Sequence, residues 1–99
     1  MLDLERIVGF DWDDGNARKN EKHGVSQAEA EQAFFDPGLL ILFDERHSAS
    51  EPRHHALGVT ITGRYLHIVF TMRDRMTRIR VISARPMHRR ERRVYASQD

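Results

Sequence analysis

The chain has 99 residues, of which 39% are hydrophobic, and its 16 basic and 15 acidic side chains leave it nearly neutral. This length accommodates one domain with a modest core, residues 1–99, and the chain lacks the run of roughly 18 apolar residues that a transmembrane helix needs. Without cysteine, disulfides and thiolate metal sites are excluded, and without an apolar signal segment we expect a cytoplasmic protein.

The first half of the chain predicts two strands that flank two helices. A strand is expected over "IVGFDWD" (Ile7–Asp13), and the following polar helix, "GNARKNEKH", is capped by Asp13 or Asp14 and ends at Gly24. A capping box, "SQAE", starts the second helix, and "DPG" ends it because proline cannot continue a helix. A buried strand is then expected over "LLILF".

The second half predicts three strands and a short helix. The β-type runs are "HHALGVTI", "RYLHIVFTM" and "TRIRVISA", and the short breaks at Gly63 and Asp74 indicate antiparallel hairpins. A helix follows over about 88–97. The order β-α-α-β-β-β-β-α predicts an α+β fold with helices on one face of an antiparallel sheet. Strict alternation along the last strand would put Ile79, Val81 and Ser83 on one side, and Arg78, Arg80, Ile82 and Ala84 on the other.

Positive charge is concentrated in the second half. Residues 1–50 carry five basic and eleven acidic side chains, net −6, whereas residues 51–99 carry eleven arginines, no lysine and four acids, net +7. Guanidinium groups bind phosphate as a planar fork, so this half suits a polyanion or an acidic protein partner. A solvated basic surface is the plain alternative. The arginines that could form a basic floor are Arg64, Arg73, Arg78, Arg80, Arg85 and Arg92.

Other side chains have both a chemical and a structural interpretation. Glu91 could act as a general base, but with His88 as N-cap it lies at N3, where its carboxylate would bond back to the cap. Tyr95 follows one turn later and could instead be a core contact. The histidine-rich stretch "HSASEPRHH" could collect a metal, although its spacing matches no motif. His67 is expected on the open sheet side with the arginines.

Several fragments together resemble the BrnT-type toxins of type II toxin–antitoxin systems. These fragments are "FDWDDGNARKNEKHGVSQAEA", "ALGVTITGRYLHIVFTMRD" and "RIRVISARPMHRRERRVY", and they cover about residues 10–95. The resemblance implies a RelE-like fold and a ribonuclease that inhibits translation by cutting RNA. It also implies a BrnA-like antitoxin with a ribbon-helix-helix domain, bound in a heterotetramer that reaches operator DNA only through the antitoxin.

The resemblance also suggests site residues. Arg64, Arg80 and Arg85 suit stabilisation of the charge that develops when the RNA 2′-hydroxyl attacks phosphorus without a metal. His23 is the first candidate for proton transfer, with Tyr95, Glu91 and Lys22 behind it, although His23 could simply close the first helix. RNA contacts are expected from Lys22, Arg73, Arg78 and Arg92, and no cofactor is expected. The rivals are a non-catalytic nucleic-acid or protein-binding module and a metal-dependent nuclease.

Overall fold

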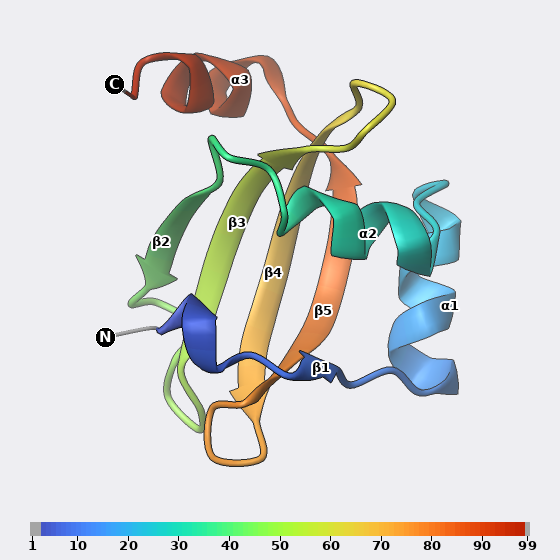
Figure 1. Ribbon diagram of the computed structural model, residues 1–99, viewed down its shortest axis with the longest axis vertical. Helices are drawn as coiled ribbons and strands as arrows, with labels where there is room; N and C mark the ends of the chain where they lie inside the picture. The colour runs from blue at the N-terminus through green and yellow to red at the C-terminus, as the bar shows by residue number, and fades with distance from the viewer. Residues whose placement is uncertain (1–2, 99) are drawn as a thin grey trace.

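The computed structural model describes residues 3–98, except the side chains of Lys19 and Asn20, so both ends of the predicted domain lie outside the described residues. The predicted element order is confirmed (Figure 1), with a short 3₁₀ helix added before the first strand. The elements are η1 (Leu4–Arg6), β1 (Gly9–Phe10), α1 (Asp14–Lys22), α2 (Gln27–Ala33), β2 (Leu40–Asp44), β3 (Arg53–Val59), β4 (Tyr65–Arg73), β5 (Arg78–Pro86) and α3 (Arg89–Ala96).

The strands form one sheet in the order β1-β5-β4-β3-β2. The predicted hairpins are confirmed, because β2 to β5 pair antiparallel with their neighbours. The expectation of a purely antiparallel sheet is wrong, since β1 pairs parallel with β5. The strand expected over Ile7–Asp13 is also shorter, although the Val8 and Asp11 amides extend the pairing by donating to carbonyls of Thr77 and Ile79.

The helices α1 and α2 begin where the sequence predicts, because side chains cap their N-termini. Asp13 and Asn16 exchange side-chain and backbone hydrogen bonds of 2.7 and 3.1 Å at the start of α1. Gly24, with φ +69°, adopts the left-handed conformation just after that helix. At α2, Ser26 and Glu29 form the predicted capping box, with both bonds at 3.1 Å.

The core lies between α2, the N-terminal segment and one face of the sheet, as Figure 1 shows. Phe34 packs edge-on against Phe70, with ring centroids 5.1 Å apart, and burying such a ring contributes roughly 1.5–3 kcal/mol. A Cβ at Gly58 would lie 2.4 Å from the carbonyl oxygen of Ala33, so glycine lets α2 approach β3. The buried core residues are Val25, Ala30, Ala33, Ala56, Leu66, Ile68, Phe70, Ile79, Val81 and Ala84.

The expectation of a buried strand over "LLILF" is wrong. β2 is an edge strand, paired with β3 alone, and its Leu42 and Phe43 side chains are 45% and 55% exposed. A continuous apolar run does not distinguish a central strand from an edge strand, because only tertiary pairing covers the second edge.

A bulge corrects the predicted alternation along β5. Val69 pairs with Ser83, but the next residue, Phe70, pairs with Val81, which leaves Ile82 as the extra residue. Ala84 is therefore buried in the core with Val81, while Ser83 shares the opposite face with the Arg80 side of the strand. Beyond the bulge, the residues of β5 that face the core are therefore the ones that strict alternation would place on the opposite face.

The opposite face of the sheet, which we call the open face, is covered by α3 only at one end. Glu91 and Val94 of α3 meet His67 and Leu57 of the open face, whereas α2 packs on the core face. The helices therefore do not all share one face. Within the described part of the chain, no helix has the length and apolar character needed to cross a bilayer.

Candidate active-site groove

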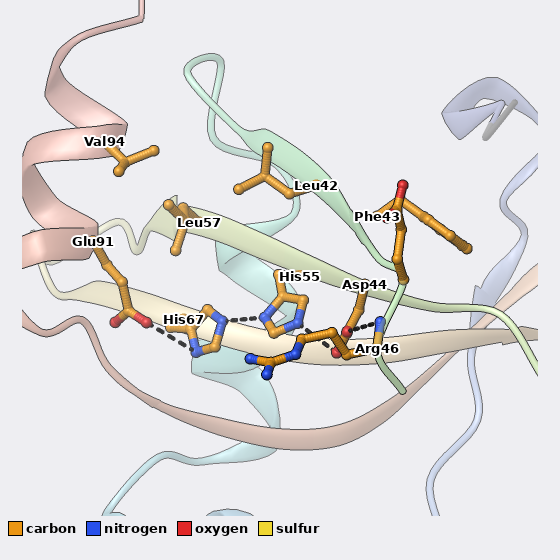
Figure 2. A pocket seen from close by; sticks show the side chains of 10 residues that line it. Leu42, Phe43, Asp44, Arg46, His55, Leu57, His67, Glu91 and Val94 are labelled. Carbon is orange, nitrogen blue, oxygen red and sulfur yellow. Dashed lines mark hydrogen bonds and ion pairs between the residues drawn. The ribbon is translucent and has the colours of Figure 1, made fainter. Parts of the chain in front are cut away.

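A groove of about 400 Å³ runs over the open face between β2 and α3. Figure 2 shows its floor, formed by side chains of β3 and β4, and its walls, formed by β2 and α3. Apolar side chains form one part of the lining and titratable groups form the other, a combination typical of binding sites. The lining residues are Leu42, Phe43, Asp44, Glu45, Arg46, His55, Leu57, His67, Glu91 and Val94.

A continuous chain of polar side chains crosses the groove (Figure 2). Asp44 Oδ2 lies 2.8 Å from His55 Nε2, and His55 Nδ1 lies 2.6 Å from His67 Nε2. His67 Nδ1 then lies 3.6 Å from Glu91 Oε2, and Glu91 accepts a two-pronged bond from Arg85 at 2.8 and 2.7 Å. We call these five residues the groove chain. It joins four strands and a helix through side chains distant in sequence.

The surroundings of the groove chain define its charges. Hydrogen bonding from His55 lowers the pKa of Asp44 to about 2. Burial raises the pKa of Glu91, but the Arg85 fork and other hydrogen bonds outweigh it and bring the pKa to about 2. Burial lowers the pKa of His67 to about 4, because a desolvated imidazolium is unfavourable. Asp44 and Glu91, on either side of the two histidines, are therefore carboxylates at neutral pH, and they can only accept hydrogen bonds.

Proton counting then determines the state of the histidine pair. Asp44 needs an N–H from His55, and the bond between the two rings needs one more. Glu91 Oε2 lies 3.6 Å from His67 Nδ1, beyond hydrogen-bond distance, and already accepts from Arg85. Two neutral imidazoles supply these two N–H groups, so an uncharged pair satisfies both hydrogen bonds. An uncharged pair agrees with the lowered pKa of His67, and it can accept one proton that would then lie between the Asp44 and Glu91 carboxylates.

Four of the residues predicted from the sequence lie together at the end of the sheet that α3 covers. Arg85 and Glu91 belong to the groove chain, and Glu91 also caps α3 by accepting from the His88 amide at 2.8 Å, as predicted. Tyr95 donates its hydroxyl to Asp36 at 2.5 Å, and burial raises its pKa to about 12. Arg92 lies 4.2 Å over the ring of Tyr65.

The remaining predicted residues lie elsewhere, and carboxylates hold the arginines among them. Arg64 pairs with Glu29 at 2.8 Å beside α2. Arg80 lies on the open face, but Asp13 and Asp11 hold it at 2.7 and 3.5 Å, and it is five residues, or roughly 16 Å of strand, from Arg85. Arg73 pairs with Glu51, and Arg78 with Asp74. Lys22 and His23 are exposed at the end of α1, on the β5 side of the sheet (Figure 1).

Sequence reasoning missed Asp44 and His55 as site residues, and it gave His67 only a minor role. The available signal was strand register: counting back from the Thr60–Arg64 turn pairs Leu57 with His67 and leaves His55 diagonally adjacent. Diagonal neighbours on one sheet face are within reach of ring side chains. Asp44 gave no comparable signal, because its place depends on β2 pairing with β3.

The histidine-rich stretch "HSASEPRHH" does not form a metal site in the structure. Within residues 3–98, no three His, Asp or Glu side chains are grouped so that they could hold a metal ion. Two of its histidines, His47 and His55, instead contact Asp44 at 3.0 and 2.8 Å. The stretch orders a carboxylate at the end of β2.

Comparison with known proteins identifies the family. The family model described as "Ribonuclease toxin, BrnT, of type II toxin-antitoxin system" matches residues 12–91, which is most of the chain and includes every member of the groove chain. A search of curated proteins finds no match. Toxins of type II systems are neutralised by a protein antitoxin, so such a partner is implied here. The chain belongs to the BrnT family of ribonuclease toxins.

Proposed function

We propose that the protein is an endoribonuclease that cuts RNA in the groove through the RNA's own 2′-hydroxyl, without a metal. The observation that carries this proposal is the hydrogen-bonded pair His55–His67, held between two carboxylates and adjacent to the Arg85 fork. Such cleavage needs removal of one proton, stabilisation of negative charge on phosphorus, and delivery of one proton to the leaving oxygen.

The histidine pair accounts for the proton transfers. In its neutral form the pair accepts the 2′-hydroxyl proton as that oxygen attacks phosphorus and the bond to the 5′-oxygen breaks. The protonated pair then gives that proton to the leaving 5′-oxygen and returns to its neutral form, so the products are a 2′,3′-cyclic phosphate and a 5′-hydroxyl. His55, with a side chain 29% exposed, faces the substrate, whereas His67, at 9%, is a positioning residue behind it.

Arg85 and Arg46 account for the charge on phosphorus. Arg85 is held rigidly by its two bonds to Glu91, and a fixed guanidinium stabilises developing charge without reorganisation. Arg46 is exposed on the groove wall, where it can turn toward a bound phosphate. Glu91 positions Arg85 and faces His67, so its role in this proposal is orientation.

We extend the proposal to the biological setting that the family suggests. Cleavage of RNA in the cytoplasm would inhibit translation. A BrnA-like antitoxin with a ribbon-helix-helix domain would neutralise the toxin in a heterotetramer, and operator DNA would be bound through that antitoxin alone. The support for these finer points is the resemblance in sequence.

The test is cleavage of a defined RNA by purified, antitoxin-free protein in EDTA, with mapping of new 5′ ends and detection of cyclic phosphate. His55→Gln and Arg85→Gln should each lower the rate by at least about 100-fold, the usual contribution of one acid–base or oxyanion group. Arg75→Gln, at the opposite end of the sheet, is the matched control and should cut normally.

Three results would contradict parts of the proposal. Normal cutting by folded His55→Gln protein would exclude the histidine pair as proton carrier. Loss of wild-type activity in EDTA, restored by a divalent ion, would indicate a metal-dependent nuclease. Tight RNA binding without new ends would favour the non-catalytic module.

A further inference from the structure

The exposed side of α3 carries an arginine cluster that the groove does not use. Arg89, Arg92 and Arg93 follow the i, i+3, i+4 spacing of one helix face, and together with Tyr65 and Ala96 they line a hollow of about 360 Å³. Among residues 3–98, none of the three arginines forms an ion pair with a carboxylate. We call this surface the α3 arginine face.

The arginines on the sheet differ from those of the α3 arginine face, because they do form ion pairs. Outside the groove chain, Arg64, Arg73, Arg78 and Arg80 each have a carboxylate partner, which neutralises part of their charge and occupies some of their donors. Within residues 3–98, no carboxylate forms an ion pair with the α3 arginine face, so its guanidinium donors can bind an external anion. A polyanion would gain more from these arginines than from those on the sheet.

An aromatic ring fixes the centre of the α3 arginine face. Arg92 lies 4.2 Å over the ring of Tyr65, within the range of a cation–π contact. Tyr95 packs edge-on against the same ring, with centroids 5.9 Å apart, and its hydroxyl is tied to Asp36. Single-stranded RNA is commonly bound by this combination, since bases stack on aromatic rings or guanidinium planes while cations contact phosphates.

The position of Tyr65 links this face to the groove. Tyr65 and His67 are alternate residues of β4 and therefore lie on the same, open face, roughly 7 Å apart along the strand. Glu91 and Val94, on another side of the same helix, line the groove itself. A strand of RNA that runs along β4 would contact both surfaces.

We propose that the α3 arginine face binds the phosphate backbone of single-stranded RNA next to the cleavage groove. This inference rests on the proposed function and adds a substrate-binding subsite to it. RNA is favoured over an acidic protein segment because the face combines a ring with guanidinium groups that no carboxylate of residues 3–98 pairs, and because it continues directly into the groove that holds the histidine pair.

The test measures binding without cleavage. The probe is a fluorescent 2′-O-methyl RNA of roughly 10 nucleotides, within the range of known single-strand sites, and its anisotropy is followed over a salt series. Each lost phosphate contact lowers the slope of log K against log salt by about 0.7, so the triple variant Arg89→Gln, Arg92→Gln, Arg93→Gln should lose about 2. Its affinity should then depend about 20-fold less on salt between roughly 50 and 200 mM.

The matched control is Arg90→Gln, which removes one charge from the same helix but lies outside the hollow. Arg93→Gln should lower the slope by about 0.7, whereas Arg90→Gln should leave it unchanged. Equal slopes for the two single variants, with unchanged circular dichroism, would overturn the inference. It would also be overturned if the triple variant bound RNA normally but lost affinity for the antitoxin, since the face would then be a protein interface.

These outcomes separate the subsite from the cleavage reaction. If wild-type protein cuts RNA but the triple variant keeps the full salt slope, the subsite is refuted and the proposed function stands. If the slope falls as expected but wild-type protein cuts no RNA, the subsite is supported and the proposed function fails.

Discussion

Replacing Glu91 with glutamine tests the electrostatics of the groove chain directly. The glutamine keeps an oxygen that can accept from the His88 amide, so the cap of α3 survives, but it removes the negative charge that Arg85 and His67 face. The Glu91 side chain is 22% exposed, so solvent screens this charge only in part. The variant therefore removes one charge and keeps the cap of α3.

The size of the effect follows from the pKa of Glu91, which is lowered from 4.5 to about 2. A folded-state pKa below the unfolded value gives stability that is complete above pH 4.5 and is lost as pH falls toward about 2. At 1.36 kcal/mol per unit, Glu91→Gln should destabilise the protein by about 3 kcal/mol at pH 7. For a chain of this size the melting temperature should fall by roughly 10–20 °C.

The assay compares urea unfolding of wild type and variant at several pH values. The difference in unfolding free energy should be about 3 kcal/mol at pH 7 and about half of that at pH 3, because protonated Glu91 resembles glutamine. Glu21→Gln, on the exposed surface of α1, is the control and should change stability by less than about 0.5 kcal/mol. A wild-type-to-variant difference that stays constant from pH 7 to pH 3 would refute the reasoning.

Three further predictions concern backbone fit and burial. Gly58→Ala should cost about 1–3 kcal/mol in thermal unfolding, because its Cβ would meet Ala33 of α2 at 2.4 Å; unchanged stability would mean that α2 moves freely. Met76→Gly should stabilise by about 1 kcal/mol, since Met76 has φ +67°, and a lower melting temperature would contradict this. As pH falls from 6.5 to about 4 the wild type should lose stability, because the imidazole of His67 takes up a proton more readily in the unfolded chain than in the folded protein. His67→Gln should reduce this loss but not abolish it, since burial also lowers the pKa of His54, and an unchanged pH profile would contradict the reasoning.

Local sequence was sufficient for the features that depend on near neighbours. The capping box of Ser26 and Glu29 and the capping bond from Glu91 were predictable, because each joins atoms three residues apart. The hairpins at Gly63 and Asp74 were also predictable, since a short break between β-type runs leaves little choice of pairing. The family could be inferred from motifs spread over most of the chain.

Longer-range features were not predictable, and each has a physical reason. The exposure of Leu42 depends on β2 having one neighbour, and the bulge after Val69 reverses the facing of Ser83 and Ala84, which strict alternation cannot show. Arg80 forms an ion pair with Asp13, which lies 67 positions away in the sequence. The number of arginines in the sequence therefore overstated the positive charge on the sheet.

By itself, the sequence determined the order of the elements, the helix caps and the concentration of arginine in the second half of the chain. The tertiary structure alone decided which of those charges remain available and that His55 and His67 share a hydrogen bond between Asp44 and Glu91. The reason is that caps and turns arise from contacts within a few residues, whereas a groove is formed by side chains that meet only when distant strands take their register.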